Sequence, residues 1–200
     1  MVWVGLTGGI ASGKSTVSQM FKEAGAFIVD ADKIVHDLLS QRGAVFHQVL
    51  NFFGTGILDG TGQIDRKKLG AIVFNDPKKL SALNKMVHPH VFLEAEREGN
   101  IVGLEDPRRV IVFDAPLLIE TRAHKKVDLV VLVYVDQATQ IKRLSERDGL
   151  TEEAANARIA LQMSLEAKRA YANEIIDNRK SIPEVQEAVN RISQMLWAAG

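Results

Sequence analysis

The chain has 200 residues, of which 46% are hydrophobic and 25% are charged, and its 25 basic and 25 acidic side chains give zero formal net charge. This balance argues against a general nucleic-acid or membrane-surface binder, which needs a basic excess. The absence of cysteine excludes disulfides, thiol nucleophiles and cysteine-based metal sites. The length predicts one compact domain with a large insertion.

Two features of the sequence bear on where the protein acts. The first six residues contain no basic leader, so we expect no signal peptide. The longest uninterrupted apolar run, Leu129 to Val135, is far too short to cross a membrane. A soluble, cytoplasmic protein is therefore expected.

The chain begins with a predicted strand, a glycine-rich loop and a helix. Residues 2–6 form an apolar run that leads into Thr7-Gly8-Gly9, as expected of a buried strand ending in a turn. Apolar residues then recur at helical spacing from Lys14 to Gly25, and residues 27–29 form a second short strand. This order predicts a parallel βαβ unit.

Residues 33–104 are predicted to form a mostly helical insertion. Apolar residues recur there at helical spacing, and strand signals are few. Asp76-Pro77 is typical of an N-cap followed by proline at the first helical position, which opens a long helix to about Glu98.

The remainder of the chain returns to alternating strands and helices. Residues 110–113 and 129–135 are continuous apolar runs, typical of strands covered on both faces, and Ile175-Ile176 predicts a short last strand. Helices are expected after Asp136, Thr151 and the capping box Ser181-x-x-Glu184. The predicted fold is α/β, with a parallel sheet between helices.

Residues 8–15, Gly-Gly-Ile-Ala-Ser-Gly-Lys-Ser, match the phosphate-loop pattern G-x-x-x-x-G-K-[ST] between the first strand and helix. Glycines let backbone N–H groups turn towards phosphate oxygens, and the helix N-terminus adds positive potential. Lys14 is placed to reach the β- and γ-phosphates, and the Ser15 hydroxyl to bind Mg²⁺. The loop predicts a nucleoside triphosphate as ligand.

Three classes of protein share such a loop: small-molecule kinases, GTPase switches and partner-coupled ATPases. The guanine-binding motif N-K-x-D has only a partial match at 84–87, which lacks the aspartate and lies in a helical segment. A D-x-x-G match at 59–62 has turn-like flanks. The GTPase class is therefore disfavoured.

Three carboxylates follow predicted strands. Asp30 and Asp32 leave the second strand, whose end we expect beside the first, where a carboxylate could take a proton from an acceptor hydroxyl. Alternatively Asp30 caps the next helix and Asp32 only favours its first turn, or one residue caps and the other catalyses. Asp114 ends an apolar run, as a Mg²⁺-binding Walker B acid does, or it anchors its own loop.

Arg143 and Arg147 lie four residues apart on one predicted helical face. They either clamp a phosphoryl group or pair with nearby acids such as Glu146 and Asp148 on a solvated surface. His88-Pro89-His90 has too few further ligands to indicate a metal site.

Together these motifs resemble the dephospho-CoA kinase family, over nearly the whole chain and in the family's order. The phosphate loop occurs in many families, but the combination is specific. The matching segments are Gly5-Leu6-Thr7-Gly8-Gly9-Ile10, Asp30-Ala31-Asp32, His88-Pro89, Asp114-Ala115-Pro116-Leu117-Leu118, Gln140-x-x-Arg143, Arg147-Asp148-Gly149-Leu150, Gln162, Lys168, Ala172 and Ile176-Asp177-Asn178.

The resemblance implies transfer of the ATP γ-phosphoryl group to the ribose 3′-hydroxyl of dephospho-CoA, with Mg²⁺ as cofactor, in the last step of CoA synthesis. It implies a three-layer P-loop NTPase fold with a nucleotide-binding core, a helical CoA-binding insertion and a helical lid. We expect ATP and dephospho-CoA as partners, and no nucleic acid, membrane or obligate protein partner. The three parts span 1–32 with 105–141 and 171–200, then 33–104, then 142–170.

The resemblance also implies roles for single residues. Asp32 would be the catalytic base, while Lys14 and Arg143 would stabilise phosphoryl charge. ATP contacts are implied for Gly9, Ile10, Ala11, Ser12, Gly13, Lys14, Ser15, Thr16, Arg147 from the lid side, and Asn178 near the adenine. Contacts to dephospho-CoA are implied for Thr7, Asp32, His36, His88 and Leu117, and Mg²⁺ ligation for Ser15 and Asp114.

The chain departs from the family pattern at a few positions. The family usually has Asp where this chain has Asn173, which bears on the adenine site. It often has Arg at His36, which bears on contacts to dephospho-CoA, Ile or Val at Ala115, and Phe at Ile119. These four positions leave the phosphate loop and Asp32 untouched.

Two other functions remain open. One is a kinase for another nucleoside or nucleotide, and the other is a nucleotide-dependent binding module that needs a protein partner. Release of ADP that depends on an acceptor separates either kinase from the module.

Overall fold

A computed structural model describes residues 1–73 and 76–199 and divides the chain into two compact units. The first, which we call the core unit, comprises Met1–Val29 and Gly99–Gly200; the second, the helical unit, comprises Asp30–Glu98.

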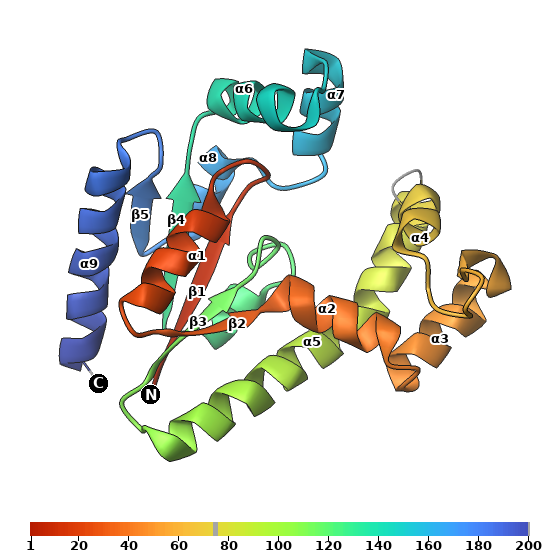
Figure 1. The fold of residues 1–200 in the computed structure, drawn as a ribbon, viewed down its shortest axis with the longest axis horizontal. Coiled ribbons are helices and arrows are strands. Elements are labelled where there is room, and N and C mark those ends of the chain that lie inside the picture. Colours follow the sequence, from red (N-terminus) through yellow and green to blue (C-terminus); the bar gives the residue numbers. More distant parts are fainter. Residues whose placement is uncertain (74–75, 200) are drawn as a thin grey trace. The chain divides into compact units, whose positions relative to one another are not determined.

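The core unit is built on a five-stranded sheet in the order β2-β3-β1-β4-β5 (Figure 1). Neighbouring strands run parallel, with Leu6 of β1 opposite Asp114 of β3 and Val131 of β4. The middle of the sheet is made of continuous buried apolar residues, as expected when helices cover both faces. The strands are β1 (Val2–Gly8), β2 (Phe27–Asp30), β3 (Val110–Asp114), β4 (Leu129–Tyr134) and β5 (Glu174–Asp177).

The expectation that the second strand ends beside the first is wrong. β3 lies between β1 and β2. The carboxylate at the end of the strand that neighbours β1 is therefore Asp114 and not Asp30. The sequence could not decide this order, because buried parallel strands are similar apolar runs and carry no signal of which neighbour they pair with.

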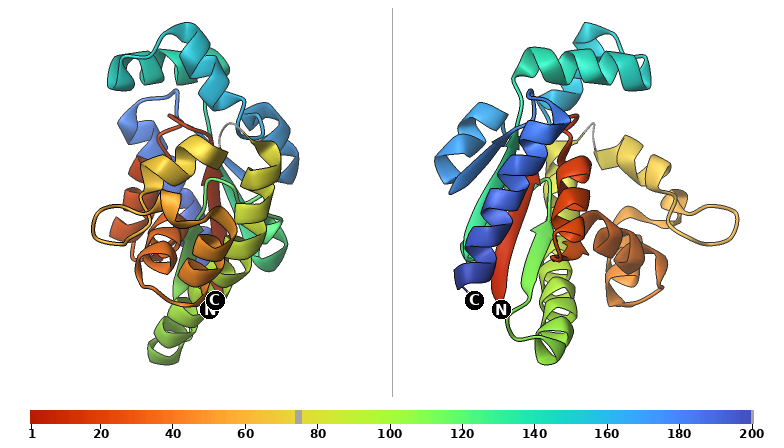
Figure 2. Two further views of the ribbon diagram at one scale, coloured as in Figure 1. Left: turned by 90° about the vertical axis from the view of Figure 1, so that its right-hand side faces the viewer. Right: turned by 60° about the vertical axis from the view of Figure 1, so that its left-hand side comes forward.

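Helices α1 (Lys14–Glu23) and α9 (Ile182–Ala199) pack against one side of the sheet, as Figure 2 shows. Phe21 of α1 and Val189 of α9 are fully buried in the same apolar cluster as Val4 and Val131 of the strands. The other elements of the core unit are η2 (Ala123–Lys126), α6 (Gln137–Asp148), α7 (Glu152–Ile159), α8 (Leu165–Lys168) and η3 (Arg169–Tyr171).

The predicted helix starts in the core unit are confirmed by their caps. Asp136 accepts a hydrogen bond from the Thr139 N–H at 2.8 Å, and Thr151 caps α7 through the Ala154 N–H at 3.3 Å. At Ser181 only half of the predicted capping box forms. The Glu184 carboxylate accepts from the Ser181 N–H at 3.0 Å, but the Ser181 hydroxyl also donates to that carboxylate instead of accepting from the helix.

The helical unit contains α2 (Ala31–Ser40), α3 (Ala44–Phe53), η1 (Thr55–Ile57), α4 (Arg66–Val73) and, as far as Glu98, α5 (Pro77–Glu105). Asp76 caps α5 as predicted, accepting from the Lys78 N–H at 3.0 Å. The helix runs to Glu105, beyond the expected end near Glu98, and the division between the units falls within it. Buried apolar side chains include Ile34, Val49, Ile57, Leu69 and Val91.

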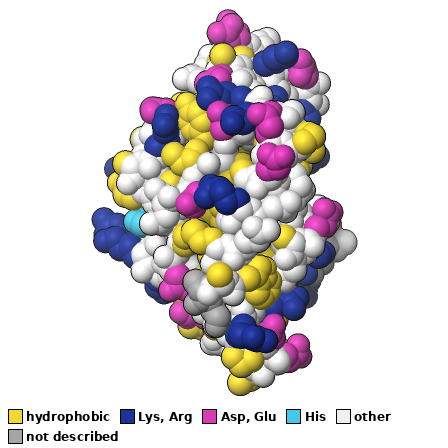
Figure 3. Space-filling view, turned by 90° about the vertical axis from the view of Figure 1, so that its left-hand side faces the viewer, with side chains coloured by type: hydrophobic (Ala, Val, Ile, Leu, Met, Phe, Trp, Pro, Cys, Tyr) yellow, Lys and Arg dark blue, Asp and Glu magenta, His cyan; other side chains and the backbone are white. Residues whose placement is uncertain are grey.

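The surface carries charges of both signs. Figure 3 shows basic and acidic side chains intermingled on one face, as expected for a chain with zero formal net charge. Among residues 1–73 and 76–199, no helix is both long and apolar enough to span a membrane.

Candidate nucleotide-binding site

The phosphate loop connects β1 to α1, as the motif requires. Gly13 precedes the helix with φ of +83°, and a Cβ at this position would collide with the Asn178 side-chain nitrogen, so glycine is needed for both reasons. Ala11 also has a positive φ, +58°. In the first turn of α1 the Thr16 N–H donates to the Gly13 carbonyl at 3.1 Å, and a helix N-terminus that follows such a loop is the usual arrangement for binding phosphate.

The Lys14 ammonium forms an ion pair with the Asp114 carboxylate. Both side chains are largely buried, at 14% and 8% exposure. The sheet places them together, because Leu6 and Asp114 are opposite each other and the Leu6 carbonyl accepts from the Ala115 N–H at 3.0 Å. Asp114 thus holds a residue of the phosphate loop, which favours a role in the site over anchoring of its own loop.

Two glutamines hold the backbone of Ile10 from both sides. Gln162 accepts from the Ile10 N–H at 2.9 Å, and the Gln140 side chain donates to the Ile10 carbonyl at 2.7 Å. Neither glutamine was assigned a role from the sequence. The available signal was the family resemblance, in which Gln140 and Gln162 are both matching residues; the structure adds that Gln140 is only 4% exposed.

The Arg143 guanidinium is bonded to backbone carbonyls. It donates to Ala11 and Ser12 of the phosphate loop, both at 3.3 Å, and to Asn178 at 2.8 Å. The Asn178 side chain in turn donates to the Ser12 carbonyl at 2.7 Å. Its alternative role was to pair with nearby acids on a solvated surface. Among the described residues, no carboxylate forms an ion pair with Arg143.

Arg147 does pair with a neighbouring acid. Its guanidinium donates to both oxygens of Asp148, at 2.8 and 2.9 Å. Asp148 also pairs with Arg158 of α7 at 3.3 Å, and these arginines hold the pKa of its carboxyl below the usual value. Asp148 thereby links the end of α6 to α7.

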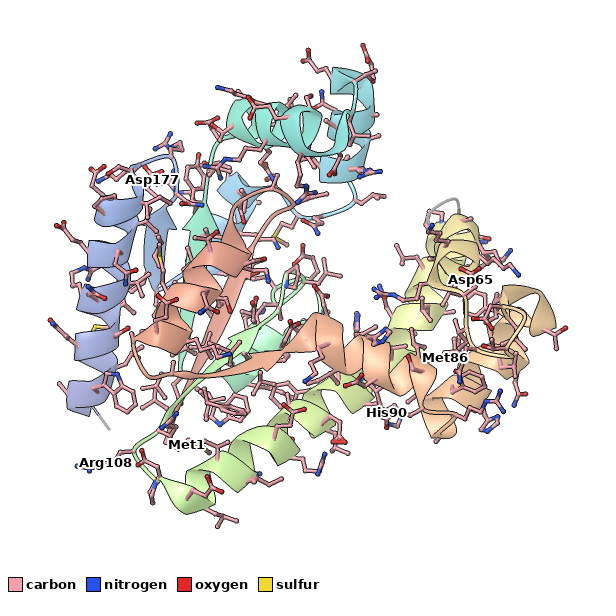
Figure 4. All side chains as sticks on the ribbon, viewed as in Figure 1. Met1, Asp65, Met86, His90, Arg108 and Asp177 are labelled. Carbon is pink, nitrogen blue, oxygen red and sulfur yellow. The ribbon has the colours of Figure 1, made fainter. Side chains whose placement is uncertain are left out.

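A cavity of about 500 Å³ lies alongside the phosphate loop. It brings Arg143, for which the resemblance implies a catalytic role, together with Arg147 and Asn178, for which it implies ATP contacts. Asp177, labelled in Figure 4, lies at the end of β5 just before Asn178. The lining residues are Ala11, Gly13, Thr16, Arg143, Glu146, Arg147, Asn178, Lys180 and Ile182.

Thr7 and Leu117 lie in two segments of the core unit, at the end of β1 and just after β3. Thr7 is fully buried and its hydroxyl donates to the Pro116 carbonyl at 3.1 Å. Leu117 is half-buried, and its carbonyl accepts from the Thr121 hydroxyl at 2.9 Å. Both residues thus help to shape the segment that follows Asp114.

The helical unit holds the other candidate residues. The Asp30 carboxylate caps α2, accepting from the N–H groups of Asp32 and Lys33 at 2.9 and 3.1 Å. Asp32 and His36 are exposed one helical turn apart on α2. His88 is half-buried in α5, and burial lowers its pKa. The structure therefore assigns the cap to Asp30, and the role of Asp32 as the base stays a prediction.

Metal-binding side chains do not gather elsewhere in the part of the chain that the structure describes, where no group of three or more His, Asp or Glu could hold a metal ion. Ser15, exposed in the first turn of α1, and Asp114 offer one hydroxyl and one carboxylate. These are oxygen ligands of the kind that Mg²⁺ takes when phosphates and water complete its coordination.

Comparison with known proteins gives one consistent result. A family model described as dephospho-CoA kinase matches residues 2–184. The dephospho-CoA kinase of Bacillus cereus is 43% identical over 181 residues, covering 90% of each chain. The crystal structure of TT1252 from Thermus thermophilus is similar with a TM-score of 0.81 at 28% identity, covering 97% of this chain and 96% of the other. Dephospho-CoA kinase from Campylobacter jejuni has a TM-score of 0.62 at the same identity and coverage.

Proposed function

Because this chain belongs to the dephospho-CoA kinase family, we propose that it transfers the γ-phosphoryl group of ATP to the ribose 3′-hydroxyl of dephospho-CoA. The products are coenzyme A and ADP, and the step completes coenzyme A synthesis. The observation that carries the proposal is the family match over residues 2–184, which includes a phosphate loop whose Lys14 is paired with Asp114.

The core unit supplies the ATP site in this proposal. The N–H groups of the phosphate loop and of the first turn of α1 bind the phosphates, with Lys14 at the β- and γ-phosphates. The cavity beside the loop takes the adenosine, with Asn178 near the adenine and Arg143 and Arg147 at its wall. Arg143 already donates hydrogen bonds to two loop carbonyls. Its guanidinium would therefore stabilise the negative charge of the phosphoryl group from a fixed position during transfer.

Mg²⁺ would be held by Ser15 and Asp114, together with phosphate oxygens and water. When bound, the ion neutralises charge that develops on the phosphates. The pairing of Asp114 with Lys14 supports this assignment, because it puts the carboxylate beside the residue that reaches the phosphates.

The helical unit supplies the acceptor site in this proposal, with Asp32 as the general base. The Asp32 carboxylate takes the proton of the 3′-hydroxyl as that oxygen attacks the γ-phosphorus, and the bond to the β–γ bridging oxygen breaks to release ADP. His36, His88, Thr7 and Leu117 are also assigned contacts to dephospho-CoA in this proposal.

We further assign this activity to the cytoplasm, on two small molecules and without an obligate protein partner, nucleic acid or membrane. Purified chain that turns over with substrates alone would support this part. Turnover that needs an added protein would contradict it.

The decisive experiment measures ADP release with ATP and Mg²⁺ in parallel reactions containing dephospho-CoA, AMP, adenosine or no acceptor. We expect release only with dephospho-CoA, and a product heavier by one phosphate at the 3′-hydroxyl. Equal release without acceptor would favour a nucleotide-dependent binding module. Release with AMP or adenosine alone would indicate a kinase for another substrate.

A further inference from the structure

Lys168, the last residue of α8, has a completely buried side chain in the core unit. Its ammonium has three N–H donors and three oxygens within reach. It donates to the Pro116 carbonyl at 2.6 Å and the Gly8 carbonyl at 3.4 Å, and it pairs with the Glu120 carboxylate at 3.1 Å. The donors are therefore fully used by the protein itself.

The three oxygens come from segments that matter for the site. Gly8 ends β1 and is the first residue of the phosphate loop, and Pro116 follows Asp114 by two residues. Glu120 also accepts a hydrogen bond, at 3.0 Å, from the N–H of Met163, a residue between α7 and α8. One ammonium thus joins the start of the loop, the segment after Asp114 and the chain that enters α8.

Stabilisation of the fold is a weak explanation for a buried ion pair between Lys168 and Glu120. Removing a charge from water is costly, and replacing a buried ion pair by apolar side chains is often neutral or stabilising. Burial does lower the pKa of Lys168, Glu120 opposes that effect, and the nearby Lys14 adds to it. The buried Lys168 cation near Lys14 therefore carries an electrostatic cost.

We propose that Lys168 is a positioning residue for ATP: its ammonium fixes Gly8 relative to Pro116, and so keeps Lys14 and Asp114 in register for the triphosphate. Lys168 acts through these two carbonyls and does not itself contact phosphate. The inference goes beyond the proposed function and rests on it only for the kinetic assay, since ATP binding is also measurable without any acceptor.

The test compares Lys168→Met with Lys125→Met, which removes an exposed lysine of η2. For Lys168→Met we expect the KM for ATP and the calorimetric Kd for ATP to rise on the order of tenfold or more, with kcat also reduced. The KM for dephospho-CoA should stay within about twofold, and Lys125→Met should match the wild type. A lower kcat with an unchanged Kd for ATP would overturn the proposal, because that is the result of a smaller folded fraction.

Glu120→Gln provides a second variant if Lys168→Met does not fold. It keeps the shape of the side chain and removes the charge that pairs with Lys168. We expect the Kd for ATP to rise in the same direction but by less, since both carbonyl contacts remain. If this variant folds and its Kd for ATP is unchanged, the ion pair between Lys168 and Glu120 plays no part in positioning ATP.

The absence of cysteine allows a sharper test of the ammonium itself. Lys168→Cys has a single thiol, which can be alkylated in denaturant before refolding. With 2-bromoethylamine the thiolate sulfur displaces bromide and gives a side chain of lysine length that ends in an amine. Iodoethane gives a neutral chain of similar size, and wild-type chain carried through the same steps controls for refolding.

We expect the aminoethylated chain to bind ATP with a Kd within a few-fold of the wild type, and the ethylated chain to bind about tenfold more weakly or worse. Equal affinity of the two adducts would overturn the proposal, because packing and not the ammonium would then decide binding. A chain that binds ATP but phosphorylates no acceptor would refute the proposed function and leave this comparison intact.

Discussion

The Lys14 ammonium is paired with the Asp114 carboxylate, although the two residues are 100 positions apart in the sequence. The pair forms because β3 lies next to β1, with Leu6 opposite Asp114, and both strands end at the same edge of the sheet. Carboxyl ends of parallel strands are where open α/β sheets bind ligands. The pair therefore lies at the edge of the sheet where we propose that the phosphates and Mg²⁺ bind.

Removing either member of this pair should affect phosphoryl transfer differently. Lys14→Met should lower kcat on the order of 10²- to 10³-fold and raise the KM for ATP, because a cation at the phosphates is lost. Asp114→Asn should raise the Mg²⁺ concentration needed for half-maximal rate. Steady-state kinetics over a Mg²⁺ series measures both. An unchanged Mg²⁺ requirement in Asp114→Asn would restrict Asp114 to holding Lys14.

Substitutions of Asp30 and Asp32 should have different effects, on the stability of the fold for Asp30 and on catalysis for Asp32. Asp30→Ala removes the cap of α2 and should lower the free energy of unfolding by about 1 kcal/mol, with kcat close to that of the wild type. Asp32→Asn should keep ATP binding and lose about 10²- to 10⁴-fold in kcat, because the acceptor proton then has no base. Denaturant unfolding and initial rates of both variants provide the measurement. A near-normal kcat for Asp32→Asn would remove it as the base.

Arg143 should not be replaceable by lysine. Arg143→Lys keeps the positive charge, but an ammonium cannot reach the carbonyls of Ala11, Ser12 and Asn178 in the same way as a planar guanidinium. We expect weaker ATP binding and a lower melting temperature. Lys142→Met, on the same helix and with a 75% exposed side chain, is the matched control. Wild-type affinity in Arg143→Lys would show that charge alone suffices.

His88 should make stability depend on pH on the acidic side of neutrality. Its pKa is lowered by burial from the ordinary value of 6.5, so the unfolded chain binds more protons between the folded pKa and 6.5. Stability contributed by neutral His88 is therefore complete above pH 6.5 and is lost as the pH falls, with a ceiling of about 1.4 kcal/mol per pH unit for one proton. Denaturant unfolding of the wild type and His88→Gln at several pH values tests this, and identical slopes would exclude His88.

Asn173 stands where the family usually has aspartate, yet its substitution should matter little for ATP. Its side-chain oxygen accepts from the Val130 N–H at 2.8 Å, and its own N–H donates to the Val130 carbonyl at 2.9 Å, near the start of β4. Asn173→Asp retains an accepting oxygen at this place. We expect a KM for ATP within about twofold of the wild type. A larger change would show that the residue acts on the adenine site through β4.

The local elements of this protein were predictable because their signals lie within a few residues of each other. The phosphate loop, the caps at Asp76, Asp136 and Thr151, and the buried strands each depend on side chains and backbone groups that neighbour one another in the chain. The resemblance over the whole length also needed only the order of motifs, and it identified the family.

Relationships between distant segments required the tertiary structure. The sequence did not show that β3 separates β1 from β2, that two glutamines hold Ile10, or that the buried Lys168 joins Gly8 to Pro116. Apolar strands are interchangeable as patterns, so their order is decided only when helices and crossovers pack on the sheet. Buried polar side chains find their partners across that packing, because an unpaired polar group inside the protein is costly.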